Sequence, residues 1–485
     1  MAQEIELKLC FTDPDPASLA NRLAKIPVLA RRKPNTQTLL NIYFDTPDLA
    51  LHHQRVALRL RRIGDATNGA WLQTLKTSGS QDSALSRRGE WESPVPGQAL
   101  MPKALEATPW SDIDPDGSLM AALSPCFMTV VQRTLWLVRR RDGTEVELAL
   151  DLGTIEAKGQ HMPICELELE LKAGQASKLF EIAQNVAKRL AVLPASLSKA
   201  ERGYLLAQGE RDHLYHAQSP DLSPKEAMPV FIQKTLHGMF TQFTANLITL
   251  QTSDDPELVH QARIGWRRFI TGLWLFKKVL KTVPPPSRLA LQPLLHGLSE
   301  LRNLDVACTQ TLPPLADIYA MGSKGRAHSW QAMMLALTQA AATQRQTVRL
   351  ALQEPAVGSC LLAFSEWLEQ LSNLEYAQFE PQEGLRQWAK SRIKPLKKKL
   401  KLAQTKIHTP EDQHHVRILA KRLRYGTEAL RKLLPTRLAK QCQQQAENLQ
   451  SSIGANRDIW LTIALMTKLK PNHEIEVFLR GISHR

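Results

Sequence analysis

The sequence predicts an α+β protein in two parts, with a β-sheet region over roughly the first 205 residues and an all-helical region after it. In the first part, charged and aliphatic residues alternate with a period of two in about eight short segments, which is typical of strands. After residue 225, apolar residues recur with helical spacing, and strand-like runs are rare. A chain of 485 residues has room for two or three domains.

These changes of pattern predict a first domain over 1–205, a linker over 206–225 and a helical domain over 226–485. The linker mixes Gly, Asp, His, Ser and Pro, which are frequent in loops. The helical domain contains an internal repeat, because His260-x-x-Arg263-Ile264-x-x-Arg267-Arg268 returns 154 residues later as His414-x-x-Arg417-Ile418-x-x-Lys421-Arg422. We therefore expect two related helical bundles, at about 226–385 and 386–485.

Composition limits the partners and the compartment. The net charge of +15 and the pI near 9.6 indicate a polyanionic partner, which could be nucleic acid, an anionic membrane or phosphate chains. The six cysteines have no CxxC spacing, which argues against a zinc ribbon or a disulfide framework and favours a reducing compartment. The N-terminus does not resemble a signal peptide, and no apolar run is long enough to span a membrane. We expect a cytoplasmic protein without a membrane partner.

The first strand sets the pattern of the β region. Glu4, Glu6 and Lys8 alternate with aliphatic residues and so share one face of a strand. Two carboxylates on one face can hold a hard divalent cation, although a solvated edge strand would read the same way. The same pattern recurs at Arg59-x-Arg61, Arg88-x-Glu90-x-Glu92 and Glu166-x-Glu168. A closed antiparallel barrel would place these faces inside a polar tunnel and leave its apolar exterior to helices.

Charge balance inside such a tunnel indicates a ligand. Several enclosed carboxylates repel one another without a metal, and several enclosed Arg and Lys side chains do so without an anion. A divalent cation together with a polyphosphate would satisfy both sets. The sequence contains no GxxxxGK[ST] phosphate loop and no credible catalytic triad.

The ordered set of motifs over 1–205 resembles the CYTH family of triphosphate tunnel metalloenzymes. The motifs that carry the resemblance are Glu4-x-Glu6-x-Lys8, Tyr43-Phe44-Asp45-Thr46, Arg59-x-Arg61, Lys76, Arg88-x-Glu90-x-Glu92, Arg133, Asp151, Glu166-x-Glu168 and Lys199. The resemblance implies an eight-stranded antiparallel tunnel with flanking helices that hydrolyses triphosphate with Mg²⁺ or Mn²⁺.

The resemblance also implies residue roles. The metal-binding carboxylates would be Glu4, Glu6, Asp151, Glu166 and Glu168, and a second metal could use Glu90 and Glu92. The phosphate-binding cations would be Lys8, Arg59, Arg61, Lys76, Arg88, Arg133 and Lys199. The catalytic set would be Glu4, Glu6, Lys8, Arg59, Arg61 and Lys76. Arginine can neutralise phosphoryl oxygens bidentately, and no covalent nucleophile is needed.

The repeated helices resemble the CHAD family of conserved-histidine α-helical domains, over roughly 226–485. Arg302-Asn303-Leu304-Asp305 and Arg457-Asp458 support the resemblance. It implies binding of inorganic polyphosphate on a basic helical surface formed by His260, Arg263, Arg267, His414, Arg417, Lys421 and Arg424. Residues at i, i+3 and i+7 share one helix face, although a solvated basic face with a structural histidine would have the same spacing. His415 follows His414 directly, so the sequence does not assign the ligand to either one.

These observations predict an inorganic triphosphatase that converts tripolyphosphate to pyrophosphate and phosphate, with a helical domain that binds polyphosphate. Alternatives on the same fold are a thiamine or nucleoside triphosphatase, an adenylate cyclase and an RNA 5′-triphosphatase. A further alternative is a non-catalytic polyphosphate-binding protein. Nucleic-acid binding rests on charge alone, because an aromatic content of 6% offers few stacking platforms. The oligomeric state stays open.

Overall fold

The computed structural model describes residues 3–12, 15–65, 67–77, 83–218, 226–373, 384–407, 409–468 and 473–483. The chain divides into two compact units. The first unit comprises Met1–His213 together with Gln353–Glu366, and the second comprises Leu214–Leu352 and Trp367–Arg485. The segment 353–366, which lies inside the predicted helical domain, is thus grouped with the first unit. Among the described residues, no helix has the length and hydropathy needed to cross a membrane.

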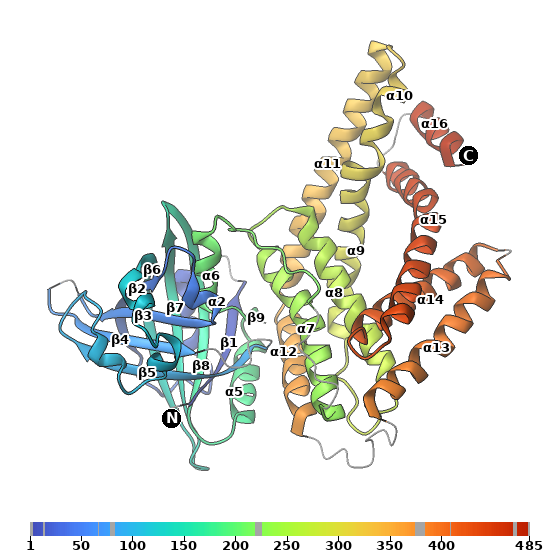
Figure 1. Ribbon diagram of the computed structural model, residues 1–485. Coiled ribbons are helices and arrows are strands. Elements are labelled where there is room, and N and C mark those ends of the chain that lie inside the picture. The colour runs from blue at the N-terminus through green and yellow to red at the C-terminus, as the bar shows by residue number, and fades with distance from the viewer. Residues whose placement is uncertain are drawn as a thin grey trace. The chain divides into compact units, whose positions relative to one another are not determined.

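The first unit is built on a closed antiparallel barrel, which confirms the predicted fold class (Figure 1). The strands follow the order β5-β4-β3-β2-β6-β7-β8-β1, and pairing between β1 and β5 closes the ring. A short ninth strand, β9, adds to β1. The strands are β1 (Gln3–Phe11), β2 (Asn35–Asp45), β3 (Val56–Ile63), β4 (Ala70–Thr77), β5 (Leu85–Val95), β6 (Ser124–Arg139), β7 (Glu145–Ala157), β8 (Gln160–Ala173) and β9 (Val192–Pro194).

The hydrophobic core of this unit lies outside the barrel wall. Leu7 and Leu9 of β1 and Leu167 of β8 are fully buried against helices, because alternation along a strand sends the aliphatic side chains outward and the charged ones inward. The helices described in the first unit are α1 (Leu19–Ala24), α2 (Ala50–His53), α3 (Trp110–Ile113), α4 (Ser118–Ala122), α5 (Ser177–Ala187) and α6 (Lys199–Ala207).

Helix α6 is fixed against the barrel at both its start and its middle. Ser198 and Glu201 form a capping box at its N-terminus. Gly203 allows close approach to the wall, since a Cβ atom at this position would lie 2.0 Å from the Phe127 ring. These contacts determine where Lys199 enters the barrel.

The second unit is helical in its described residues. Its helices are α7 (Met228–Thr249), α8 (Pro256–Leu275), α9 (Gln292–Val306), α10 (Ala316–Ala320), α11 (Lys324–Leu352), α13 (Gly384–Gln404), α14 (Pro410–Ala429), α15 (Thr436–Lys468) and α16 (His473–Ser483), and α12 (Pro355–Gln370) ends in it.

Helices α8 and α14, which carry the repeated motif, contact each other through two related pairs. Arg268 of α8 forms an ion pair with Glu428 of α14 (2.9 Å), and Arg422 of α14 lies over the Trp274 ring of α8 (5.2 Å to the ring centre). Each partner in the second pair lies 154 positions from its counterpart in the first. The offset of the sequence repeat therefore also relates these contacts, while the exact boundaries of the two bundles stay a prediction.

Candidate functional site in the barrel

The barrel encloses a cavity of about 750 Å³ whose lining carries as many cationic as anionic side chains. The nine cationic residues are Lys8, Arg55, Arg59, Arg61, Lys76, Arg88, Arg133, Lys172 and Lys199. The nine acidic residues are Glu4, Glu6, Glu90, Glu92, Glu147, Asp151, Glu168, Glu170 and Glu201. An additional anion in this balanced cavity would need positive charge to accompany it.

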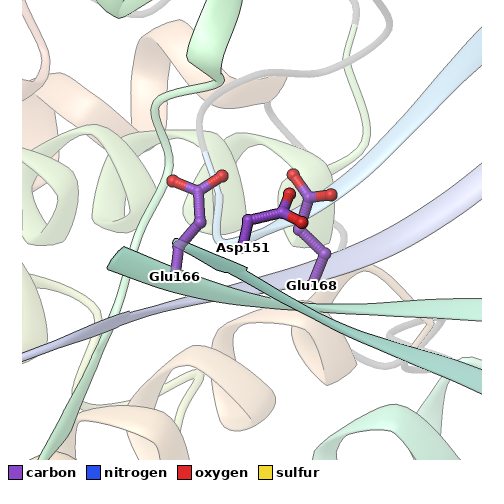
Figure 2. A group of neighbouring side chains, drawn as sticks. All are labelled: Asp151, Glu166 and Glu168. Carbon is purple, nitrogen blue, oxygen red and sulfur yellow. The ribbon is translucent and has the colours of Figure 1, made fainter. Parts of the chain in front are cut away.

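Asp151, Glu166 and Glu168 form a carboxylate cluster on β7 and β8. One oxygen from each lies within 4.8 Å of one from each of the others, and Figure 2 shows the three carboxyl groups on the same side of the strands. The register explains the cluster, because Asp151 is paired directly with Glu166, and Glu168 is two residues further along the same face. The three side chains are almost fully buried or lie in the cavity wall, with Asp151 at 0% exposure.

Lys199 of α6 places its ammonium group among these carboxylates. Its Nζ lies 2.6 Å from Asp151 Oδ2, 2.5 Å from Glu166 Oε1 and 2.7 Å from Glu168 Oε1. Arg202, one helical turn later, also contacts Glu166. Burial alone would raise the pKa of Asp151, but Lys199 and Arg133 hold it below its usual range. The cluster therefore already contains a cationic group.

The strand order places a cationic wall across the cavity from this cluster. In the closed ring, β3 is four strands from β8 in either direction, and β4 is four strands from β7. Arg59 and Arg61 project into the cavity from β3, and Lys76 projects from β4. Burial, reinforced by Arg88, lowers the pKa of Lys76. These three cations thus face the carboxylate cluster across the cavity, while Lys76 also pairs with Glu4 and Glu90 on its own side.

Arg61 differs in its partners from Arg59, Arg88 and Arg133, which all form ion pairs with carboxylates. Its Nε donates a hydrogen bond to Asn41 Oδ1 (2.8 Å), and among the described residues no carboxylate lies within ion-pair distance of it. Burial and the neighbouring Arg59 and Arg133 lower the pKa of Arg61 to about 10. An anion bound next to this guanidinium would relieve that repulsion.

Glu4 and Glu6 do not belong to the carboxylate cluster, although Glu6 neighbours Glu168, and both are paired with cations. Arg88 contacts Glu4 (2.5 Å) and Glu6 (2.9 Å), and Lys76 contacts Glu4 (3.1 Å). Lys8 lies between Glu6 (3.3 Å) and Glu168 (3.1 Å). Burial and the neighbouring Glu168 raise the pKa of Glu6, whereas Lys76 and Arg88 outweigh burial and lower that of Glu4. The five predicted metal-binding carboxylates therefore divide into a cluster of three and a cation-paired set of two.

Glu90 and Glu92 also point into the cavity, on β5. Glu90 pairs with Lys76 (2.9 Å) and Arg59 (3.4 Å), and Glu92 accepts a hydrogen bond from Thr74 (3.2 Å). Their neighbours in this structure are thus cations and a hydroxyl group. That Glu90 and Glu92 bind a second metal stays a prediction.

The donor set of the carboxylate cluster fits a divalent cation. Its ligands are hard oxygens, which Mg²⁺ and Mn²⁺ prefer. The Lys199 ammonium occupies the space between these carboxylates, since it lies within 2.7 Å of each of them. A metal ion at this place would require Lys199, which sits at the first turn of α6, to turn its flexible side chain away.

In the second unit, the predicted basic residues of the first copy lie on one region of α8. Arg263 donates a hydrogen bond to Ser299 of α9. Burial lowers the pKa of His260 to about 4, with Arg302, Arg267 and Arg263 adding to the effect against Glu257. The first copy thus surrounds His260 with arginines, and the imidazole itself is neutral near pH 7.

The second copy is described in part. Arg417, Lys421 and Arg424 lie on α14, and His415 is exposed there. The side chains of His414 and Arg457 fall outside the described residues. Asp305 of the first copy is buried and pairs with Arg345 (3.0 Å), whereas Trp460, which follows the second-copy motif, is 42% exposed.

Several residues in or next to the cavity received no role from the sequence reasoning. Arg202 was not assigned, although its position three residues after Lys199 places both on one face of a helix. Asn41 and Tyr43, which contact Arg61 and Arg59, are polar residues on inward positions of β2. His52 stacks on Tyr204 of α6 (4.3 Å between ring centres), a contact between distant segments with no sequence signal.

Comparison with known proteins agrees with this division of the chain. The CYTH domain model matches residues 2–204, and the CHAD domain model matches residues 234–467. An inorganic triphosphatase from Haemophilus influenzae is 34% identical over 213 residues, which are 42% of this chain and 55% of that protein. The chain therefore matches about half the length of this relative.

Two solved structures are similar to separate parts of the chain. The CHAD domain from the plant Ricinus communis is 22% identical and covers 55% of this chain and 89% of that one, with a TM-score of 0.48. A Hippeastrum protein, assigned as an adenylyl cyclase and reported to have a dominant triphosphatase activity, is 19% identical and covers 41% of this chain and 95% of that one, with a TM-score of 0.31. By these two matches, the chain carries a CYTH domain followed by a CHAD domain.

Proposed function

We propose that this protein is a metal-dependent inorganic triphosphatase that hydrolyses tripolyphosphate to pyrophosphate and phosphate in the barrel cavity. The observation that carries the proposal is that a set of cations faces a carboxylate cluster across the cavity. Arg59, Arg61 and Lys76 project from one wall, and the carboxylate cluster of Asp151, Glu166 and Glu168 lies on the opposite one. A metal–triphosphate complex carries both signs of charge and is complementary to both walls.

Charge balance supports a substrate that enters together with a cation. The lining is neutral overall, so a bare triphosphate would leave several negative charges without partners. When bound, a divalent cation held by Asp151, Glu166 and Glu168 would supply Lewis-acid neutralisation of phosphate oxygens. The protein's cations would bind the remaining oxygens, with Arg61 available because no described carboxylate pairs with it.

The cavity favours a substrate without an organic part. The aromatic side chains among its lining residues are Tyr43 and Tyr204 with the imidazoles of His52 and His53, and His52 already stacks on Tyr204. A nucleotide base or thiazolium ring would need a comparable open platform. Thiamine triphosphate, nucleoside triphosphates and RNA 5′-triphosphate are thus the runner-up substrates on the same site.

A substrate panel tests this proposal. The full chain with Mg²⁺ or Mn²⁺ should release phosphate from tripolyphosphate faster than from ATP, thiamine triphosphate or an RNA 5′-triphosphate. Glu168→Gln should lose at least 100-fold in rate, while Glu106→Gln, at an exposed position outside the cavity, should keep the parent rate. If none of the four substrates releases phosphate, the enzymatic proposal is contradicted, and the alternative of a non-catalytic polyphosphate-binding protein is favoured.

We also propose that the helical domain binds inorganic polyphosphate at the basic faces of α8 and α14. His260, Arg263 and Arg267 lie close enough on α8 for the two arginines to disfavour protonation of the histidine. Bound phosphates would offset this repulsion. Labelled polyphosphate should bind the full chain, and Arg263→Gln with Arg267→Gln should weaken binding at least tenfold without changing tripolyphosphate hydrolysis. If RNA displaces the polyphosphate at lower concentration, the assignment fails.

None of the six cysteines, all of which lie in the described residues, forms a disulfide, which supports the proposed cytoplasmic location.

A further inference from the structure

Helix α13 carries an unusual one-sided charge. Its 21 residues include eight Lys and Arg side chains and no Asp or Glu. Leu385, Ala389, Ile393, Leu396 and Leu400 are buried and hold the helix against its unit. Arg386, Lys394, Lys398, Lys399 and Lys401 are exposed. The apolar residues therefore account for the packing, and the cations form a separate outer face.

Comparison with α7 shows that the bundle does not require these cations. The predicted repeat pairs α13 with α7, which begins 156 positions earlier and precedes α8 as α13 precedes α14. Helix α7 is buried along most of its length and contains one lysine, Lys234, and no arginine. The basic face is a property of the second copy alone.

The exposed lysines of α13 have no acidic partners. Lys394, Lys398 and Lys401 lie at i, i+4 and i+7 and so share one face. No carboxylate of the described chain forms an ion pair with any of the three. The neighbouring Lys397 contacts an uncharged group, Gln441 (3.2 Å). From Arg386 to Lys401 the cations extend along about 22 Å of helix. The mutual repulsion of such a row would be relieved by an anionic surface of similar length.

One further exposed residue indicates which kind of anionic partner fits this face. Leu402, next to Lys401 and one turn beyond Lys398, is 58% exposed. A leucine in a row of lysines contributes nothing to contact with phosphate chains in water, but it can enter the headgroup region of a bilayer. The exposed face of α13 has no aromatic side chain on which bases could stack, since Trp388 packs against Phe276.

We propose that the exposed face of α13, at Lys394, Lys398, Lys401 and Leu402, binds the surface of an anionic phospholipid bilayer. The helix lies in the orange segment of the second unit, packed along α14 (Figure 1). Lysine ammonium groups reach lipid phosphates as point charges, and Leu402 adds a small apolar contact. Such a peripheral contact needs no spanning segment. It involves none of the residues assigned above to hydrolysis or to polyphosphate.

Vesicle flotation of the full chain tests the proposal. Vesicles of phosphatidylcholine with an equal amount of phosphatidylglycerol should carry the protein upward at low salt, and phosphatidylcholine vesicles should not. Lys394→Glu, Lys398→Glu and Lys401→Glu together should weaken binding at least 100-fold. The matched control, Lys277→Glu, Lys278→Glu and Lys281→Glu, makes the same change of net charge at three exposed lysines after α8 and should bind within threefold of the parent.

Leu402→Ser gives a second, milder variant and should weaken vesicle binding about threefold. Circular dichroism and tripolyphosphate hydrolysis, unchanged in all variants, would show that the chain is folded. The proposal is overturned if the parent protein does not bind anionic vesicles, or if both triple variants lose vesicle binding equally. It is also overturned if the triple variant of α13 binds vesicles like the parent but binds RNA or polyphosphate more weakly.

Discussion

Lys199 Nζ lies 2.6 Å from Asp151 Oδ2, inside the carboxylate cluster that would hold a metal. The lysine and a divalent cation therefore compete for one position. We predict that Lys199→Met binds Mn²⁺ about tenfold more tightly without substrate, which corresponds to ~1.4 kcal/mol, and hydrolyses tripolyphosphate more slowly. Titration calorimetry with Mn²⁺ measures the first effect. Lys188→Met, which removes an exposed lysine from the end of α5, should leave both unchanged, and weaker Mn²⁺ binding by Lys199→Met would refute the competition.

Arg61 and Arg133 should respond differently to removal of their charge. Arg61→Gln removes a half-buried cation that lies near two other arginines and pairs with no described carboxylate, so the first unit should keep its stability within about 0.5 kcal/mol. Arg133→Gln deprives the fully buried Asp151 of two hydrogen bonds, at 2.7 and 2.6 Å, and should cost about 3 kcal/mol.

Denaturant unfolding of both variants measures this difference, and phosphate release should fall at least 100-fold in each. A larger loss of stability in Arg61→Gln than in Arg133→Gln would show that Arg61 is a structural residue.

His260 makes polyphosphate binding dependent on pH. Its pKa of about 4 lies below the usual 6.5, so the free domain holds the imidazole neutral. Because the unfolded chain takes up a proton here first, the free energy of unfolding decreases as pH falls from about 6.5 towards 4. Bound phosphate would raise the pKa. At pH 5.5, polyphosphate binding should therefore take up protons and tighten relative to pH 7.5.

Calorimetry in two buffers of different ionisation enthalpy measures the proton uptake. His260→Gln should abolish the part that belongs to this residue, while His296→Gln, at an exposed position on α9, should not. Equal uptake in His260→Gln and the parent would exclude His260 as the responsive group.

Gly203 should control the position of α6. Gly203→Ala places a methyl group against Phe127, so the helix must move and carry Lys199 and Arg202 away from the carboxylate cluster. We expect a loss of at least tenfold in tripolyphosphate hydrolysis, while polyphosphate binding by the helical domain stays unchanged. Gly238→Ala is the control, since a Cβ at this position of α7 meets no atom within 4 Å. Parental activity in Gly203→Ala would show that the wall can accommodate the methyl group.

The sequence predicts the barrel because alternation is a local property. Glu4, Glu6 and Lys8 share a face in any strand, and the repetition of this pattern indicates that the charged faces enclose one space. Register is not local. The pairing of Asp151 with Glu166, and the separation of Glu4 from this pair, depend on how distant strands align. The partners of Glu90 and the stacking of His52 on Tyr204 likewise arise only in the closed barrel.

Closure of the barrel also has a consequence for synthesis of the chain. Strand β1, the first strand of the barrel to be synthesised, pairs with β5, β8 and β9, and β9 ends at Pro194. Contacts of such large sequence separation form slowly, because the entropy of closing a long loop is lost before they form. The first strand can pair with β5 once Val95 has been made, but its other neighbour, β8, ends only at Ala173, so the ring stays open for most of the synthesis of this unit. We expect ring closure to be a late step of folding, and slowed translation near Pro194 to raise the yield of folded protein.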